Sequence, residues 1–363
     1  MMKKNRMYNY ELLRIIAMIM IILLHTLSYG GARESYQVNE FGYIVMNLIR
    51  GIAYLGVNCF VMISAWFLCE KTFRFKRVFT TWLQTVFYTL LCFIVLILST
   101  KQISIKDLTG VLFPITKQTY WFVSCYILLL CLQPIINLII EKSNEKQLRH
   151  YVIILIVIFS IIPTLIPWSR EITSSGTDLV WFITIYMFIA YIRKYGDKNL
   201  LILKEKYKWL LLIVGIISGV FLDYTGSILI FKINANISID KLFYYNNSFM
   251  YFAASFGLFL IFRKLDCDKF SKFICIPAST TFGIYLLHDN PLIKEYIWKI
   301  LSILLPCSHN IVINVGSCFL KVIIIFFFGM IIELIRQVIF NLTKLERLSS
   351  WIDSIFNNVC NKI

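Results

Sequence analysis

The feature that most constrains this 363-residue chain is its series of long apolar blocks, separated from one another by short charged runs. Each block is roughly 17–25 residues long, which is the length a helix needs to cross the hydrocarbon core of a bilayer. The blocks are continuous rather than alternating, and 59% of the residues are hydrophobic whereas only 15% are charged. This pattern excludes a soluble globular domain and predicts an all-α, polytopic membrane protein.

Ten blocks are predicted to span the membrane. They cover residues 12–30, 43–68, 78–99, 119–140, 151–167, 179–192, 208–231, 247–262, 275–304 (interrupted at 288–291) and 311–339. Most of the 36 Lys and Arg residues fall in alternate loops on the side of the N-terminus, so the positive-inside rule places both termini in the cytoplasm. We expect one transmembrane domain over residues 1–345 and a short cytoplasmic tail over residues 346–363.

The net charge of +16 follows from the same loop asymmetry and suits contact with membrane lipids, so no nucleic-acid partner is predicted. The ten cysteines form no C-x-x-C pair and show no metal-ligand spacing, and the pattern H-E-x-x-H is absent. No metal site is therefore predicted. Phosphate-loop and nucleophile-elbow patterns are absent as well.

Three ionisable residues interrupt the first apolar block: Glu11, Arg14 and His25. A helix turns 100° and rises 1.5 Å per residue, so Arg14 and His25 lie within about 20° of one face and about 16 Å apart along the axis. Glu11 falls on the same stripe. Such a stripe must line a protein interior or a wet cavity, because an unpaired charge in lipid costs several kcal/mol.

Two interpretations of the stripe stay open from the residues alone. Glu11 and Arg14 are either functional or simply anchor a helix end by pairing and by reaching toward the interface. His25 lies too deep for an anchoring role, and a neutral imidazole is suited to general-base catalysis, so we interpret it as a functional residue.

Several motifs together resemble the acyltransferase-3 family of integral membrane acyltransferases. The first is the acid-x-x-Arg-x(10)-His pattern from Glu11 to His25. The others are NCFVMISAWFL (58–68), RFKR (74–77), TYWFVSCYILLLCLQPII (119–136) and TFGIYLLHDNPLI (281–293). Members of the family are ten-helix proteins that modify bacterial surface glycans, often by O-acetylation. This sequence differs from many members in carrying Glu11 in place of Asp, and Ala65 in place of the Gly that follows Ser64.

The resemblance implies a donor site for acyl-CoA, with acetyl-CoA the expected donor and no metal. Arg74 and Arg77 are expected to clamp its phosphates, since two guanidinium groups spaced by three residues suit a diphosphate or a 3′-phosphate. Arg14 and Glu11 would line the channel for the pantetheine arm. His25 would be either the general base or an acyl-carrying nucleophile. The alternative for the arginine pair is a basic cluster that binds lipid headgroups.

The remaining candidates are expected to contact the substrate acceptor. Pro291 breaks the ninth span and exposes the polar groups just before it. A histidine at a helix terminus and an interfacial aromatic belt are the competing explanations for these residues. The substrate-binding candidates are Ser64, Tyr120, Trp121, Tyr285, His288, Asp289 and Asn290.

The function that the resemblance implies is O-acyl transfer, with acetyl the expected group, from cytoplasmic acyl-CoA to a hydroxyl of an extracytoplasmic or lipid-linked glycan. Exopolysaccharide, capsule and cell wall are the acceptor classes, and a bacterial cytoplasmic membrane is the expected location. A transporter or flippase for a glycan or lipid-linked sugar is the main alternative, because transporters also keep buried charges near the midplane. The oligomeric state stays open between monomer and homodimer.

Overall fold

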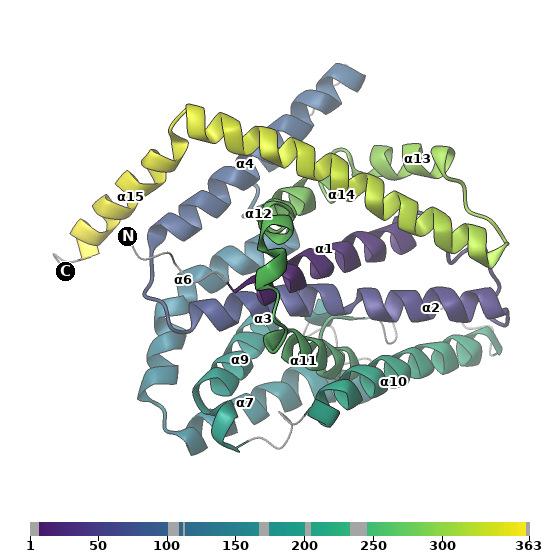
Figure 1. The fold of residues 1–363 in the computed structure, drawn as a ribbon, viewed down its shortest axis with the longest axis horizontal. Helices are drawn as coiled ribbons and strands as arrows, with labels where there is room; N and C mark the ends of the chain where they lie inside the picture. The colour runs from purple at the N-terminus through teal and green to yellow at the C-terminus, as the bar shows by residue number, and fades with distance from the viewer. Residues whose placement is uncertain are drawn as a thin grey trace.

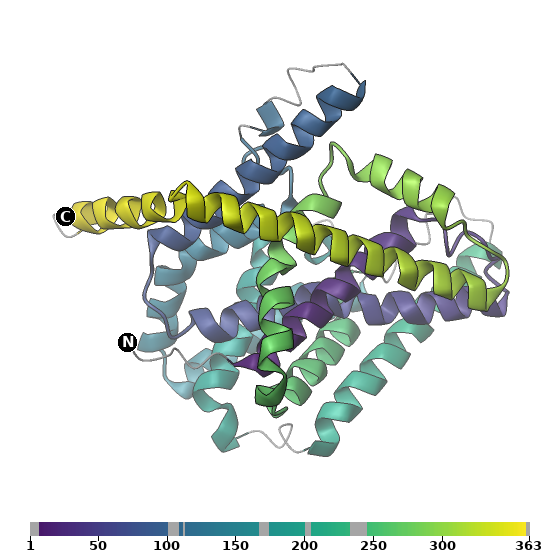
Figure 2. The same ribbon diagram turned by 45° about the horizontal axis from the view of Figure 1, so that its top comes forward.

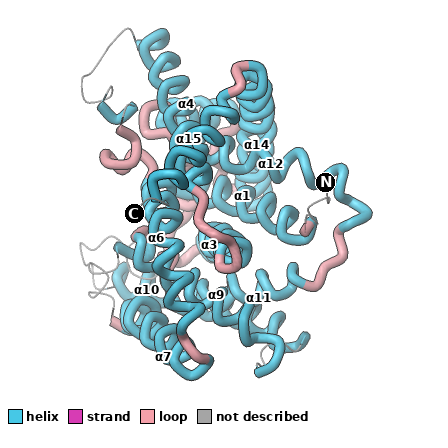
Figure 3. The backbone as a smooth tube through the Cα atoms, turned by 90° about the vertical axis from the view of Figure 1, so that its left-hand side faces the viewer, coloured by secondary structure: helices cyan, strands magenta, loops and turns pink. Residues whose placement is uncertain are grey.

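The computed structural model describes residues 7–100, 109–111, 113–166, 174–199, 205–232 and 245–360. Over these residues the chain is helical and contains no strand (Figure 3). Continuous apolar runs form helices in a membrane because each helix satisfies its own backbone hydrogen bonds. The helices are α1 (Tyr8–Tyr29), α2 (Phe41–Ala53), α3 (Leu55–Leu68), α4 (Phe75–Thr100), α6 (Trp121–Lys142), α7 (Glu145–Ile156), α8 (Ile162–Leu165), α9 (Leu179–Asn199), α10 (Glu205–Lys232), α11 (Phe249–Arg263), α12 (Ser271–His288), α13 (Lys294–Leu304), α14 (Ile311–Leu342) and α15 (Leu345–Cys360).

Eight helical segments within the described residues are long and apolar enough to cross a membrane. Three of them are composite. α2 and α3 form one segment over Phe41–Leu68, α7 continues through a π-helical turn, Val157–Ile161, into α8, and a 3-10 turn, Asp268–Phe270, leads directly into α12. α11 is a shorter apolar helix of 15 residues, and α9 is not among the eight. Helices therefore occupy all ten predicted blocks, while the count of ten crossings and the cytoplasmic termini remain predictions.

The predicted interruption of the ninth block is confirmed, because α12 ends at His288 and α13 begins only at Lys294. α13 has 11 residues and is thus about 16 Å long, far less than the roughly 30 Å of a bilayer core. It buries Trp298 and Leu301. Only the α12 half of the predicted block 275–304 is therefore a candidate span.

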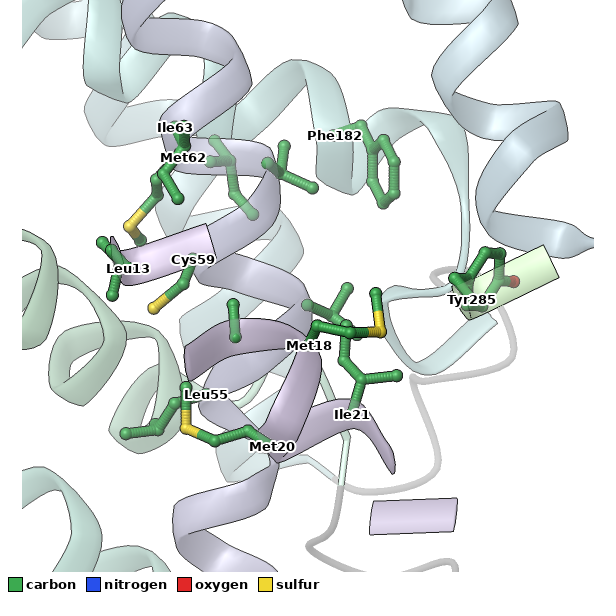
Figure 4. Close-up of a cluster of buried hydrophobic side chains, with 14 of the residues drawn as sticks. Leu13, Met18, Met20, Ile21, Leu55, Cys59, Met62, Ile63, Phe182 and Tyr285 are labelled. Atoms are coloured by element: carbon green, nitrogen blue, oxygen red, sulfur yellow. The ribbon is translucent and has the colours of Figure 1, made fainter. Parts of the chain in front are cut away.

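α1 lies near the centre of the fold (Figure 1). It contacts α3, α12 and α14 and runs in the opposite direction to α14 (Figures 1 and 2). Figure 4 shows two contacts between these helices in the buried hydrophobic cluster: Met20 of α1 lies beside Leu55 of α3, and Leu13 of α1 lies beside Cys59 of α3. α3 approaches closely because residue 56 is glycine: a Cβ there would lie 2.8 Å from the Ala17 carbonyl oxygen.

A buried polar cluster joins α4, α12 and α14, and we call it the Glu333 cluster. Its carboxylate is 1% exposed and accepts hydrogen bonds from Tyr88 Oη at 2.6 Å, from Gln84 Nε2 and from Gln337 Nε2. Arg336 donates two more, at 2.9 and 2.6 Å. The helices meet here because residue 283 is glycine, where a Cβ would lie 2.1 Å from Glu333 Oε2.

The C-terminal segment forms the amphipathic helix α15, which packs against the start of α4. Asp353 Oδ1 accepts a hydrogen bond from the Lys76 backbone amide at 2.9 Å, and the rings of Phe75 and Phe356 stack at 4.8 Å. Figure 1 shows α15 beside α4. Residues 346–360 of the predicted tail thus belong to a docked helix, and residues 361–363 lie outside the described residues. The domain boundary at residue 345 stays a prediction.

Candidate active site

A cavity of about 330 Å³ lies between α1, α3, α4, α6 and α12, and we call it the central cavity. Its volume falls within the range of about 300–1,000 Å³ that is usual for small-molecule sites. Five of the predicted site residues line it: Arg14, His25, Ser64, Trp121 and Tyr285. Two members of the polar stripe of the first helix, Arg14 and His25, therefore face a cavity inside the protein.

Arg14 and His25 mark two levels of the central cavity, with Met18 and Ile21 lining it between them. Their spacing of four, three and four residues keeps all four side chains on one helix face, as the sequence predicts. Glu11 does not line the cavity. Its Oε2 accepts a hydrogen bond from Arg14 Nη1 at 2.8 Å, so it positions the guanidinium one turn away.

His25 is joined to His288 across the α1–α12 contact. Nδ1 of His25 lies 3.0 Å from Nε2 of His288, whose own Nδ1 lies 2.7 Å from the carbonyl oxygen of Ile284. His288 is 1% exposed, whereas the side chain of His25 is 17% exposed. The structure thus places the predicted sugar-binding residue His288 behind His25, away from the open surface.

The hydrogen bonds fix the tautomers of this pair. A carbonyl oxygen only accepts, so Nδ1 of His288 carries a hydrogen and, in the neutral ring, Nε2 is an acceptor. Nδ1 of His25 must then donate to it, which leaves the lone pair of neutral His25 on Nε2. Among the described residues, no group hydrogen-bonds to that nitrogen. His25 is therefore oriented as a base.

Asp289 and Lys294 complete the surroundings of His25. Asp289 Oδ1 lies 4.0 Å from His25 Nδ1 and 3.9 Å from Lys294 Nζ. Burial raises the pKa of the Asp289 carboxyl, while His288 and Lys294 act in the opposite direction. A carboxylate at this distance favours a positive charge on the imidazole if Nε2 takes up a proton.

Tyr120 and Asn290 are joined by a hydrogen bond between their side chains. Asn290 Nδ2 donates to Tyr120 Oη at 2.5 Å, and that hydroxyl donates to the Leu286 carbonyl oxygen at 2.6 Å. Both residues are buried, so this pair holds the start of α6 against the end of α12. Their predicted role in substrate binding stays a prediction, and the structure adds a positioning role.

The sequence model of the acyltransferase-3 family, described as an acyltransferase domain, matches residues 7–335. This is nearly the whole chain. The protein belongs to the acyltransferase-3 family. The members of this family are membrane proteins that generally transfer acyl groups to sugars. The chain matches no curated protein and no solved structure.

The arginine pair of this acyltransferase lies at the start of α4, outside the lining of the central cavity. Arg74 is exposed just before the helix. Arg77 donates from Nη1 to the Thr72 carbonyl oxygen at 2.8 Å and to Gln133 Oε1 at 3.3 Å. The carbonyl oxygen of Arg77 accepts a hydrogen bond from Thr81 Oγ1 at 2.9 Å, and Thr81 lines the central cavity one helical turn further along α4.

Two residues of the acyltransferase site were not predicted. Gln133 is buried in α6, accepts from Arg77 and donates to the Leu68 and Lys71 carbonyl oxygens, so it fixes the α3–α4 loop. Tyr126 lines the central cavity together with Ser64. The sequence does contain a signal for Gln133, because it is a polar residue inside the apolar run of α6. The described residues contain no cluster of His, Cys, Asp and Glu suited to a metal ion.

Proposed function

We propose that this acyltransferase moves an acyl group, with acetyl the expected group, from cytoplasmic acyl-CoA to a hydroxyl of an extracytoplasmic or lipid-linked glycan. The observation that carries the proposal is the hydrogen bond between His25 and His288. It leaves a basic nitrogen on an imidazole that lines a cavity, and Arg14 lines the same cavity about 16 Å away along α1.

The donor would occupy the central cavity with its phosphates outside. A volume of about 330 Å³ suits the narrow pantetheine arm and the thioester rather than the whole nucleotide. With the N-terminus in the cytoplasm, Arg14, Arg74 and Arg77 would meet the charged end of acyl-CoA as it arrives from that side. The thioester would then lie at the level of His25.

In the general-base form of the reaction, His25 Nε2 takes the proton of the acceptor hydroxyl as its oxygen attacks the thioester carbonyl. The new bond joins this oxygen to the acyl carbon, the carbon–sulfur bond breaks, and the imidazolium returns the proton to the CoA thiolate. Asp289 offsets the transient charge. In the acyl-carrier form the same nitrogen attacks first. Both forms depend on Nε2 and on its orientation by His288.

The first experiment is His25→Ala in correctly inserted protein, with NMR of the surface glycan as the readout. Acyl esters are expected to disappear while the glycan backbone and its export remain normal. Intact esters would contradict the catalytic role of His25. Unmodified glycan retained inside the cell would instead favour the transporter.

The second experiment concerns the donor. Replacing Arg74 and Arg77 together by Ala is expected to weaken acyl-CoA binding, measured by calorimetry in detergent, because two charge-assisted phosphate contacts are lost. Lys142→Ala, an exposed basic residue at the end of α6, is the control. Unchanged affinity in the double variant would remove the clamp and leave the arginines as a lipid-binding cluster.

A further inference from the structure

A second cavity lies on the other side of His25 from the Arg14 level of the central cavity. Its volume is about 230 Å³, and we call it the α13 cavity. It is lined by Tyr29 of α1 and by five residues of α13. These are Lys294, Glu295, Trp298, Lys299 and Ser302. None of them belongs to the family motifs that identify the donor site.

The α13 cavity is connected to the catalytic pair by direct contacts. Tyr29 is one helical turn beyond His25, and their ring centroids are 5.8 Å apart. Lys294 Nζ donates to Tyr29 Oη at 3.3 Å and lies 3.9 Å from Asp289 Oδ1, the carboxylate that flanks His25. Two residues of the cavity lining, Tyr29 and Lys294, therefore contact His25 and the carboxylate beside it.

Trp298 supplies an unused donor. The residue is 3% exposed, and its indole Nε1 has no hydrogen-bond partner among the described residues. Leaving a buried N–H unpaired is unfavourable, so such a group is a candidate for a ligand contact. Its ring lies 6.1 Å from that of Tyr29, and paired aromatic rings beside polar groups are suited to a sugar.

The charges on the cavity favour an anionic sugar. Two ammonium groups, of Lys294 and Lys299, line it against one carboxylate, of Glu295. Lys294 is shared with Asp289, while Lys299 is exposed and forms no ion pair with any described residue. An ammonium on the rim of a cavity attracts a carboxylate or phosphate substituent.

We propose that the α13 cavity is the acceptor subsite and that it binds a sugar carrying a carboxylate or phosphate group. This inference rests on the proposed function, because it assigns the acceptor of the same reaction. Trp298 and Tyr29 hold the sugar ring, Lys299 binds the anionic substituent, and a hydroxyl of the sugar reaches His25 Nε2.

The test measures the release of CoA from acetyl-CoA by the purified full-length protein in the presence of three probes. Methyl β-glucuronide and glucose 6-phosphate are the anionic probes, and methyl β-glucoside is neutral. We expect at least one anionic sugar to stimulate release at a concentration about tenfold lower than the neutral one, as one charge-assisted hydrogen bond provides. Equal half-saturation for all three, or no stimulation by any of them, overturns the assignment.

Three variants locate the effect. Lys299→Gln is expected to raise the half-saturation for the anionic sugar about tenfold and to leave the neutral one unchanged. Glu295→Gln, on the same cavity, removes a charge of opposite sign, so the half-saturation for the anionic sugar should stay unchanged or fall. Trp298→Phe keeps a ring but removes the N–H, and should raise the value for both kinds of sugar. A rise in Glu295→Gln equal to that in Lys299→Gln, or no change in Lys299→Gln, overturns the proposal.

Acetyl-CoA affinity is measured in parallel by calorimetry and is expected to be equal in all of these proteins. If the unaltered protein fails to bind acetyl-CoA, the proposed function fails and not only the acceptor subsite. If it binds acetyl-CoA normally while the sugars show no preference, only the acceptor assignment is overturned.

Discussion

The His25–His288 pair and the Glu333 cluster are both ionisable groups buried between helices, yet their polar atoms are used differently. Glu333 accepts hydrogen bonds from Tyr88, Gln84, Arg336 and Gln337. His25 uses one ring nitrogen on His288 and lines a cavity with the other unpaired. Burial of an ionisable group in a membrane therefore does not by itself indicate function. A polar atom that lines a cavity and has no hydrogen-bond partner is the better indication of function.

The largest expected effect separates the two clusters by activity. His25→Ala should lower the rate of acyl transfer about 10²–10⁴-fold, the usual contribution of a general base. It should lower the free energy of unfolding by no more than about 1–3 kcal/mol, the cost of leaving His288 Nε2 without its donor. The rate is measured with purified protein and acetyl-CoA. His150→Ala is the control, because that histidine is exposed and its Nδ1 lies 2.6 Å from the Lys146 carbonyl oxygen. If the His25→Ala variant retained its activity, the His25–His288 pair would have a structural role only, like the Glu333 cluster.

Glu333→Ala should show the reverse pattern. It leaves the Arg336 guanidinium buried without its carboxylate, so the free energy of unfolding should fall by about 3–5 kcal/mol, while the rate per folded molecule stays near that of the unaltered protein. Thermal unfolding in detergent is the measurement, with the exposed Glu141→Ala as the control. Full stability together with lost activity would assign the Glu333 cluster a catalytic role.

His288→Ala tests whether the second histidine positions the first. We expect kcat to fall about 10²-fold with little change in KM for acetyl-CoA, because the tautomer of His25 is no longer fixed. His288→Gln carries an amide oxygen that accepts the same hydrogen bond and should restore part of the rate. Equal losses in both variants, or a change confined to KM, would argue against positioning.

The smallest effect concerns how tightly the Glu333 cluster is enclosed. Gly283→Ala places a methyl group 2.1 Å from Glu333 Oε2 and should cost about 1–3 kcal/mol through overpacking. Gly316→Ala in α14 is the matched control, since a Cβ there meets nothing within 4 Å. If the two variants were equally stable, the side chains around Glu333 would have to shift easily to make room for the added methyl group.

The part of the fold and site that could be predicted is the part set by local periodicity. The spacing from Arg14 to His25 is a property of one helix, so the sequence alone places both on one face, and both line the central cavity. Apolar blocks likewise predict helices. The position of each block along the chain follows from composition, whereas the number that cross the membrane depends on marginal cases such as α9 and α11.

What could not be predicted depends on contacts between distant segments. His25 and His288 are 263 residues apart, and only the packing of α1 on α12 shows that one orients the other. Glu333 interrupts an apolar block as clearly as Glu11 does. Helical spacing alone predicts its partners Arg336 and Gln337 on α14, but Tyr88 comes from α4, which no spacing rule brings to Glu333. Arg77 looked like a free phosphate ligand because its partner Gln133 lies on another helix.

The anchor at the far end of the histidine pair is the carbonyl oxygen of Ile284, a main-chain atom one turn back on α12. Replacing the side chain at position 284 would not remove it. The backbone of α12 therefore determines which nitrogen of each imidazole carries the proton. Unwinding the last turn of α12 would remove the basic form of His25 without changing any residue that touches the substrate.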